Sequence, residues 1–309
     1  MLPQALAAIP VAASALAIAA LATAIAAPAR SGAPPSSALD AARAAYLASM
    51  EGRKADTLAA VQELAARLPV EQMLAGGGSG WELAPQYAAL VRFGLWDELI
   101  ALTPPDARAP GLTAGYLYGR GVALAARGRL AEARAALAEL AALAAAVPAD
   151  ESAHASAHAP LGNPTLRDVL RVAVPVLAAR IAATELRNAD AIGALEQATA
   201  AEDRLAASAA AGWFFPVRHL LGAQLLVAGR PAEAERVYRE DLQRHPDNGW
   251  ALFGLAAAQR AGNHRSAAAV SQREFSRVWK RADVRLRSSA FWFPGPDTTS
   301  CECQRQSAD

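Results

Sequence analysis

From Ser37 onward, the hydrophobic and polar residues recur with the period of an α-helix. Apolar residues return every three or four positions, and no alternating run of β-branched residues is long enough for a strand. Short segments that contain glycine separate these helical stretches. The pattern predicts an all-α protein made of consecutive helices.

The separators share one arrangement, in which a glycine ends one helix and the next helix begins shortly afterwards. In AGRPAEAERVY, Gly229 supplies a left-handed C-cap, and Pro231 suits the first position of the following helix. Related separators contain Gly52, Gly94, Gly128 and Gly262. The intervals between successive glycines are 42, 34, 101 and 33 residues. Most of them fit one or three units of about 34 residues, which indicates a repeat.

The segment FPVRHLLGAQLLVAGRPAEAERVYREDLQRHP fits such a unit at several independent positions. When Leu221 and Gly222 take the Leu-Gly pair of the first helix, later positions of the pattern hold a small residue, an aromatic residue and a proline: Ala234, Tyr238 and Pro246. The next unit repeats the pattern with Trp250 and Gly254. We expect the glycines to let two helices approach closely and Trp250 to fill the gap to the neighbouring hairpin.

These residues make the chain resemble the C-terminal half of a group of uncharacterised bacterial tetratricopeptide-repeat (TPR) proteins. The resemblance runs from about Tyr46 to Leu286 and is strongest from Trp213 to Asn263. Relatives carry an acidic, proline-containing stretch before the position of Trp213, where this chain has AASAAAG. The family implies no enzymatic activity. We interpret the chain as a TPR-like α-solenoid of five to six antiparallel hairpins, because each hairpin buries its apolar face only against its neighbours.

The N-terminal segment differs from the repeats. Residues 1–29 contain no charged side chain, but their apolar stretch is shorter than the roughly 20 strongly apolar residues that a membrane span needs. Small residues around Ala24 to Ala26 match a signal-peptide cleavage pattern, although no positive charge precedes the apolar stretch. We predict a signal peptide or membrane anchor at 1–29, a linker at 30–37, the solenoid at 38–287 and an irregular tail at 288–309. A periplasmic or secreted protein, free or anchored, is expected, with a cytoplasmic location as the alternative.

Five residues are expected on the concave face of the solenoid, in a groove formed by the first helices of the hairpins: Tyr46, Tyr118, His219, Asn248 and Gln259. Their neutral aromatic and amide character suits an extended peptide or a partner helix. We therefore predict a non-catalytic scaffold that binds a protein or peptide through this groove. The net charge of +1 gives no reason to expect nucleic acid. We interpret the eight basic residues between positions 260 and 287 as the polar cap of the solenoid.

Recognised catalytic motifs are missing from the sequence, including the nucleophile elbow, the phosphate-binding loop and the zinc-protease helix. We therefore expect neither an enzyme nor a cofactor. The alternative hypothesis is a metal- or small-ligand-binding accessory domain that uses His154 and His158 in a loop, or Cys301 and Cys303 in the tail. Each pair supplies two of the four ligands of a structural zinc site, so no metal site is predicted.

Overall fold

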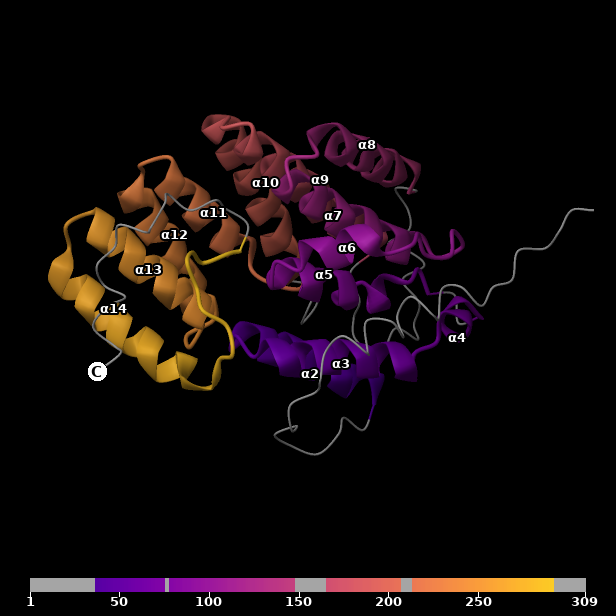
Figure 1. Ribbon diagram of the computed structural model, residues 1–309, viewed down its shortest axis with the longest axis horizontal. Coiled ribbons are helices and arrows are strands. Elements are labelled where there is room, and N and C mark those ends of the chain that lie inside the picture. The colour runs from indigo at the N-terminus through magenta and orange to yellow at the C-terminus, as the bar shows by residue number, and fades with distance from the viewer. Residues whose placement is uncertain (1–36, 76–77, 148–164, 207–212, 292–309) are drawn as a thin grey trace, which may run out of the picture.

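The structure is a computed structural model that describes residues 37–75, 78–147, 165–206 and 213–291. Every regular element in these ranges is a helix, and neighbouring helices pack in adjacent pairs (Figure 1). The pairs are α2 (Ala38–Met50) with α3 (Lys54–Arg67), α5 (Pro85–Arg92) with α6 (Trp96–Ala101), α7 (Pro110–Ala126) with α8 (Leu130–Ala146), α9 (Leu166–Thr184) with α10 (Asn188–Ala206), α11 (Val217–Val227) with α12 (Pro231–Arg244), and α13 (Gly249–Ala261) with α14 (Arg265–Val278). The shorter elements are α4 (Val70–Ala75), η1 (Trp81–Leu83) and η3 (Trp279–Arg281). The prediction of an all-helical, solenoid-like protein is confirmed.

Left-handed glycines connect the helices of several pairs. The φ angles are 70° at Gly52, 74° at Gly128 and 72° at Gly229. Glycine adopts this conformation without the steric cost that a Cβ brings. Between α13 and α14 the arrangement differs, because Gly262 has a φ of −82° and Asn263 has a φ of 62°. The prediction of a left-handed Gly262 is therefore wrong by one residue, since asparagine also tolerates that conformation.

The ring of Tyr238 is the centre of the packing between the last two pairs. Tyr238 lies on α12 and is fully buried. A Cβ at Gly222 of α11 or at Gly254 of α13 would overlap its ring. The two glycines therefore let α11 and α13 approach the same aromatic side chain. Ala234, one turn before Tyr238, is also fully buried, whereas Pro246 lies exposed after the end of α12.

The two ends of the helical array meet. The carboxylate of Asp283, which follows η3, accepts hydrogen bonds from the backbone nitrogens of Lys54 and Ala55 at 2.6 and 2.9 Å. Asp283 thus caps the first turn of α3, although it lies more than 200 positions away. Trp279 fills the space beside Gly52, where a Cβ would overlap its indole ring. In Figure 1 the yellow end of the chain accordingly lies beside the indigo α2.

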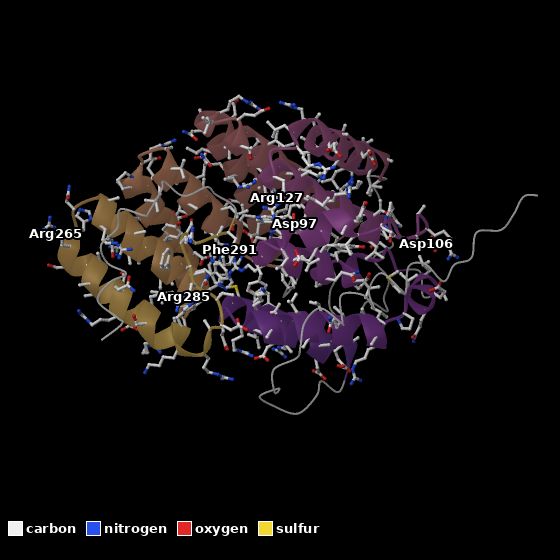
Figure 2. All side chains as sticks on the ribbon, viewed as in Figure 1. Asp97, Asp106, Arg127, Arg265, Arg285 and Phe291 are labelled. Atoms are coloured by element: carbon white, nitrogen blue, oxygen red, sulfur yellow. The ribbon has the colours of Figure 1, made fainter. Side chains whose placement is uncertain are left out.

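The described part of the tail also folds back onto the helices. The ring of Phe291 lies 5.7 Å from that of Trp250, and its Cβ lies beside Gly94 (Figure 2). The predicted leader at 1–29, most of the linker and the tail from position 292 lie outside the described residues. Within the described ranges, no helix is both long and apolar enough to cross a membrane.

Candidate functional site

The five residues predicted for the concave groove do not line an open surface. Tyr118 is 2% exposed, His219 0%, Asn248 3% and Gln259 3%, and only Tyr46 is half-buried. The prediction assumed an open curve of hairpins. In the structure, Gln259 instead donates to Glu235 of α12 and accepts from Ser271 of α14. The prediction of an open groove is therefore corrected, and the other four residues fall into two separate environments.

The first environment is a buried polar cluster, defined as Arg92, His219, Asp241 and Asn248. Arg92 Nη1 donates to His219 Nδ1 at 3.0 Å. His219 Nε2 lies 3.2 Å from Asp241 Oδ2 and 2.5 Å from Asn248 Nδ2. Asn248 Nδ2 donates to the same carboxylate oxygen at 2.6 Å, and Asn248 Oδ1 accepts from the backbone nitrogen of Trp250 at 3.1 Å. The imidazole thus bridges a buried cation and a buried anion.

Burial governs the protonation states in this polar cluster. It lowers the pKa of Arg92 to about 9, so the guanidinium keeps its charge at neutral pH. That charge lies 3.7 Å from the ring centroid of Trp250 and 5.0 Å from that of Phe215, which stabilises a buried cation. Burial also lowers the pKa of His219 to about 4, so the imidazole is neutral. Burial raises the pKa of the Asp241 carboxyl, but its contacts with His219 outweigh that effect and hold the pKa below the usual value.

The polar cluster stabilises the packing of helices and is not open to a substrate. Its four members are at most 3% exposed, and they come from α5, α11, α12 and the cap of α13. A substrate would have to separate packed helices to reach the imidazole. The same region holds the hydroxyl of Tyr46, whose pKa is raised to about 12 by burial and then by nearby Asp241. We therefore assign the polar cluster to joining α5 to the last two hairpins.

The second environment is a pocket between η1, α5, α7 and the segment before α11. We call it the aromatic pocket and define it by its lining: Trp81, Ala84, Pro85, Ala88, Gly115, Tyr118, Trp213 and Phe214. Its volume is about 40 Å³, room for roughly three water molecules. A pocket of this size accepts a single small side chain or ring rather than a whole cofactor.

The aromatic rings of this pocket are arranged around Trp213. The rings of Trp81 and Trp213 stack with centroids 6.0 Å apart and an interplanar angle of 18°. Tyr118 meets Trp213 edge-on at 5.2 Å. Gly115 allows this arrangement, because a Cβ there would lie 2.9 Å from Ala84 and push α7 away from the start of α5.

Two polar atoms in the lining of the aromatic pocket lack hydrogen-bond partners. The hydroxyl of Tyr118 and Nε1 of Trp213 are both buried, and neither meets a partner among the described residues. Burial raises the pKa of Tyr118, so the hydroxyl keeps its proton at any physiological pH. Leaving such a group unpaired costs about 1–3 kcal/mol. Both atoms are closed to solvent, so neither is open to a ligand in the pocket as the structure stands.

Sequence reasoning selected Tyr118 but missed Trp81, Trp213 and Phe214. Trp81 follows the glycine-rich GGGSG, and Trp213 follows an alanine-rich stretch, so neither sits on a repeat position. The weak signal was that two of the six tryptophans of an aromatic-poor chain lie directly after segments of small residues. The distance of 132 positions between the two gives no indication that their rings stack.

The structure does not describe the side chains that the sequence offered as alternative metal ligands. His154, His158, Cys301 and Cys303 all lie outside the described residues. Within the described ranges, no three histidine, cysteine, aspartate or glutamate side chains are grouped so that they could hold a metal ion.

Comparisons with models of known families, with curated proteins and with solved structures found no match.

Proposed function

We propose that this chain is a non-catalytic helical scaffold that binds a protein partner, and that the aromatic pocket is its contact site. The observation that carries the proposal is a pocket that opens at the surface and is lined mainly by aromatic and small apolar side chains, among them Trp81, Trp213 and Phe214. Pockets lined by aromatic and apolar side chains are typical of binding sites. Trp81, Pro85 and Phe214 are half-buried and form the rim that a partner would reach first.

We also propose that the scaffold is of the TPR type. The support is the packing of Tyr238 between Gly222 and Gly254, together with the left-handed glycines that connect the helices. In TPR arrays an aromatic residue of the second helix packs against the small residues of neighbouring first helices.

For the N-terminal segment, we propose export to the periplasm or beyond. N-terminal sequencing of the protein recovered from the native host tests this, and an intact Met1 in a soluble cytoplasmic fraction would contradict it.

The scaffold proposal is tested by blocking the aromatic pocket. Ala88 on α5 lines the pocket, so Ala88→Phe should fill it. Ala138→Phe on the exposed side of α8 adds the same ring elsewhere and is the matched control. Full-length tagged protein carrying each change would be used for affinity capture in the native host, with partners identified by mass spectrometry. Partners retained by wild type and Ala138→Phe but lost from Ala88→Phe are expected. Equal retention by all three proteins would refute the pocket as the contact site.

A further inference from the structure

We propose that the C-terminal strap, residues 282–291, occupies a binding site for an extended segment of a partner protein, and that a partner segment with the same pattern of side chains replaces it. The strap follows η3 and runs back from the end of α14 toward α11, as the yellow segment without a helix in Figure 1. We call the surface that it contacts the strap site and define it by six residues: Gly52, Phe93, Gly94, His219, Tyr238 and Trp250. None of them lines the aromatic pocket, so the inference goes beyond the proposed function.

The first half of the strap has the two faces of an extended segment. Asp283, Arg285 and Arg287 are exposed. Val284 and Leu286, which alternate with them, are half-buried and buried. Successive side chains of an extended chain point to opposite sides, so this alternation places one face of the strap against the helices.

The second half of the strap is held by two specific side chains. Ser289 Oγ donates to the backbone oxygen of His219 at 2.8 Å and lies 2.7 Å from the hydroxyl of Tyr238. The ring of Phe291 meets that of Trp250 edge-on at 5.7 Å. A hydroxyl and an aromatic ring therefore engage α11, α12 and α13 together.

Two further contacts extend the pattern toward the other end of the array. Leu286 belongs to one apolar cluster with Phe93 and Trp250. The carboxylate of Asp283 caps α3, as described above. The strap site thus selects an acidic residue, an apolar residue three positions later, a hydroxyl three positions after that, and an aromatic ring two positions further on.

The backbone of the strap contributes little to this attachment. Within the described ranges, the backbone nitrogen of Asp283 donates to Gly52 O at 3.2 Å, but none of the nitrogens from 284 to 291 donates to a backbone oxygen. Another extended segment that brings the same side chains can therefore make the same contacts. Because the strap is tethered to its site, it competes at a high effective concentration, and a partner binds only to the fraction of molecules in which the strap is detached.

The test measures binding of a fluorescein-labelled peptide, ADVRLRSSAF, which copies residues 282–291, to full-length protein by fluorescence anisotropy. The double variant Asp283→Ala/Ser289→Ala weakens the strap and leaves the strap site unaltered. It should bind the peptide at least about tenfold more tightly than wild type, because its site is open more often. The matched control is Arg285→Ala/Arg287→Ala, which changes two side chains on the exposed face and should bind like wild type.

Variants of the peptide test the pattern itself. Alanine in place of Ser289 or Phe291 of the peptide should weaken its binding to the double variant about three- to tenfold. Alanine in place of Ser288 is the control, since Ser288 makes no hydrogen bond to the described residues and its loss should leave binding unchanged. Equal binding of the Ser288 and Ser289 forms would overturn the inference.

Circular dichroism establishes that each variant is folded. Should the double variant unfold, Ser289→Ala alone replaces it, with the same ranking expected at a smaller ratio. Absence of peptide binding to the folded variants, or equal binding by wild type and the weakened strap, would overturn the inference. So would loss of binding when Ala88→Phe is added, because it would place the peptide in the aromatic pocket. A wild-type dimer that the peptide dissociates would assign the strap site to a second copy of the chain and overturn the partner segment.

Discussion

The indole Nε1 of Trp250 donates a hydrogen bond to the backbone oxygen of Ser49 at 2.9 Å, across 201 positions of the chain. The same indole ring lies over the guanidinium of Arg92 and meets Trp279 edge-on at 5.4 Å. Trp250 therefore contacts Arg92 of the polar cluster and also joins the last hairpin to the first. This contact makes the stability of the first hairpin depend on residues near the other end of the array.

The cap that Asp283 provides for α3 gives a first prediction. Asp283→Ala removes both acceptors of the Lys54 and Ala55 backbone nitrogens and should lower the free energy of unfolding by about 1 kcal/mol. Urea denaturation followed by circular dichroism measures this change. Asp283→Asn keeps one side-chain oxygen and should recover part of the loss. If both variants match wild type, the cap contributes nothing to the joining of the two ends.

The two buried tyrosines Tyr118 and Tyr238 should respond in opposite ways to loss of the hydroxyl. Ser289 Oγ donates to the backbone oxygen of His219 at 2.8 Å, so Tyr238 donates to Ser289 Oγ at 2.7 Å. Tyr238→Phe should therefore cost about 1–1.5 kcal/mol. Tyr118→Phe removes a buried hydroxyl without a partner and should leave the melting temperature unchanged or raise it.

Thermal unfolding of these two variants beside wild type settles the comparison. A stabilised or neutral Tyr118→Phe would show that the Tyr118 hydroxyl adds nothing to the stability of the fold. Destabilisation similar to that of Tyr238→Phe would mean that the Tyr118 hydroxyl has a hydrogen-bond partner in solution.

Leu186, between α9 and α10, offers a stabilising substitution. It adopts a φ of 61° and is 78% exposed, so it combines a strained backbone with an exposed apolar side chain. Asn263 holds the equivalent conformation between α13 and α14. Leu186→Asn should therefore raise the free energy of unfolding by about 0.5–1 kcal/mol, because asparagine tolerates the left-handed region better than leucine does.

The converse change is Gly128→Ala, which should destabilise by about 1 kcal/mol through backbone strain. Gly128 has a φ of 74°, and a Cβ there would meet no atom within 4 Å. Clashes with neighbouring residues therefore add nothing to the loss of stability. Denaturation midpoints of both variants are the measurement. A neutral Gly128→Ala would show that this connection relaxes easily to another conformation.

The buried imidazole of His219 predicts a pH dependence of stability. Its pKa is about 4 in the folded protein and about 6.5 when unfolded, so between these values the unfolded chain binds the extra proton. Stability should therefore fall as the pH decreases from 6.5 to 4, by about 3 kcal/mol from this residue. The lowered pKa of Asp241 adds a loss in the same direction, as its carboxylate becomes protonated at lower pH.

His219→Gln isolates the contribution of the imidazole. The variant should be less stable than wild type at pH 7, because Arg92 and Asp241 lose their bridge. The difference should narrow toward pH 4, since only wild type loses the imidazole contribution over that range. Unfolding free energies at a series of pH values provide the test, and a constant difference would contradict the assignment of a neutral buried histidine.

The helices and their connections could be predicted from the sequence because those signals are local. Helical periodicity, Gly229 followed by Pro231, and the spacing of Gly222 and Tyr238 all concern residues of one or two neighbouring hairpins. Even so, the left-handed position fell on Asn263 rather than Gly262, since two adjacent residues both tolerated it.

The meeting of the two ends could not be predicted in the same way. It depends on a small rotation at every hairpin, summed along the array. No spacing in the sequence links Ser49 to Trp250 or Asp283 to Lys54. His219 and Asn248 were therefore expected in a groove, although their polar side chains serve a buried cluster. The aromatic pocket was missed for the same reason, because Trp81 and Trp213 come from distant segments.

The capping of α3 by Asp283 has a consequence for synthesis. A chain grows from its N-terminus at about 5–20 residues per second, so the 229 positions between Lys54 and Asp283 take on the order of ten to fifty seconds to make. During that interval, the first turn of α3 lacks its cap and Gly52 lacks the indole that covers it. The α2–α3 hairpin thus gains its cap and its covering indole only after nearly all of the helical array has been made.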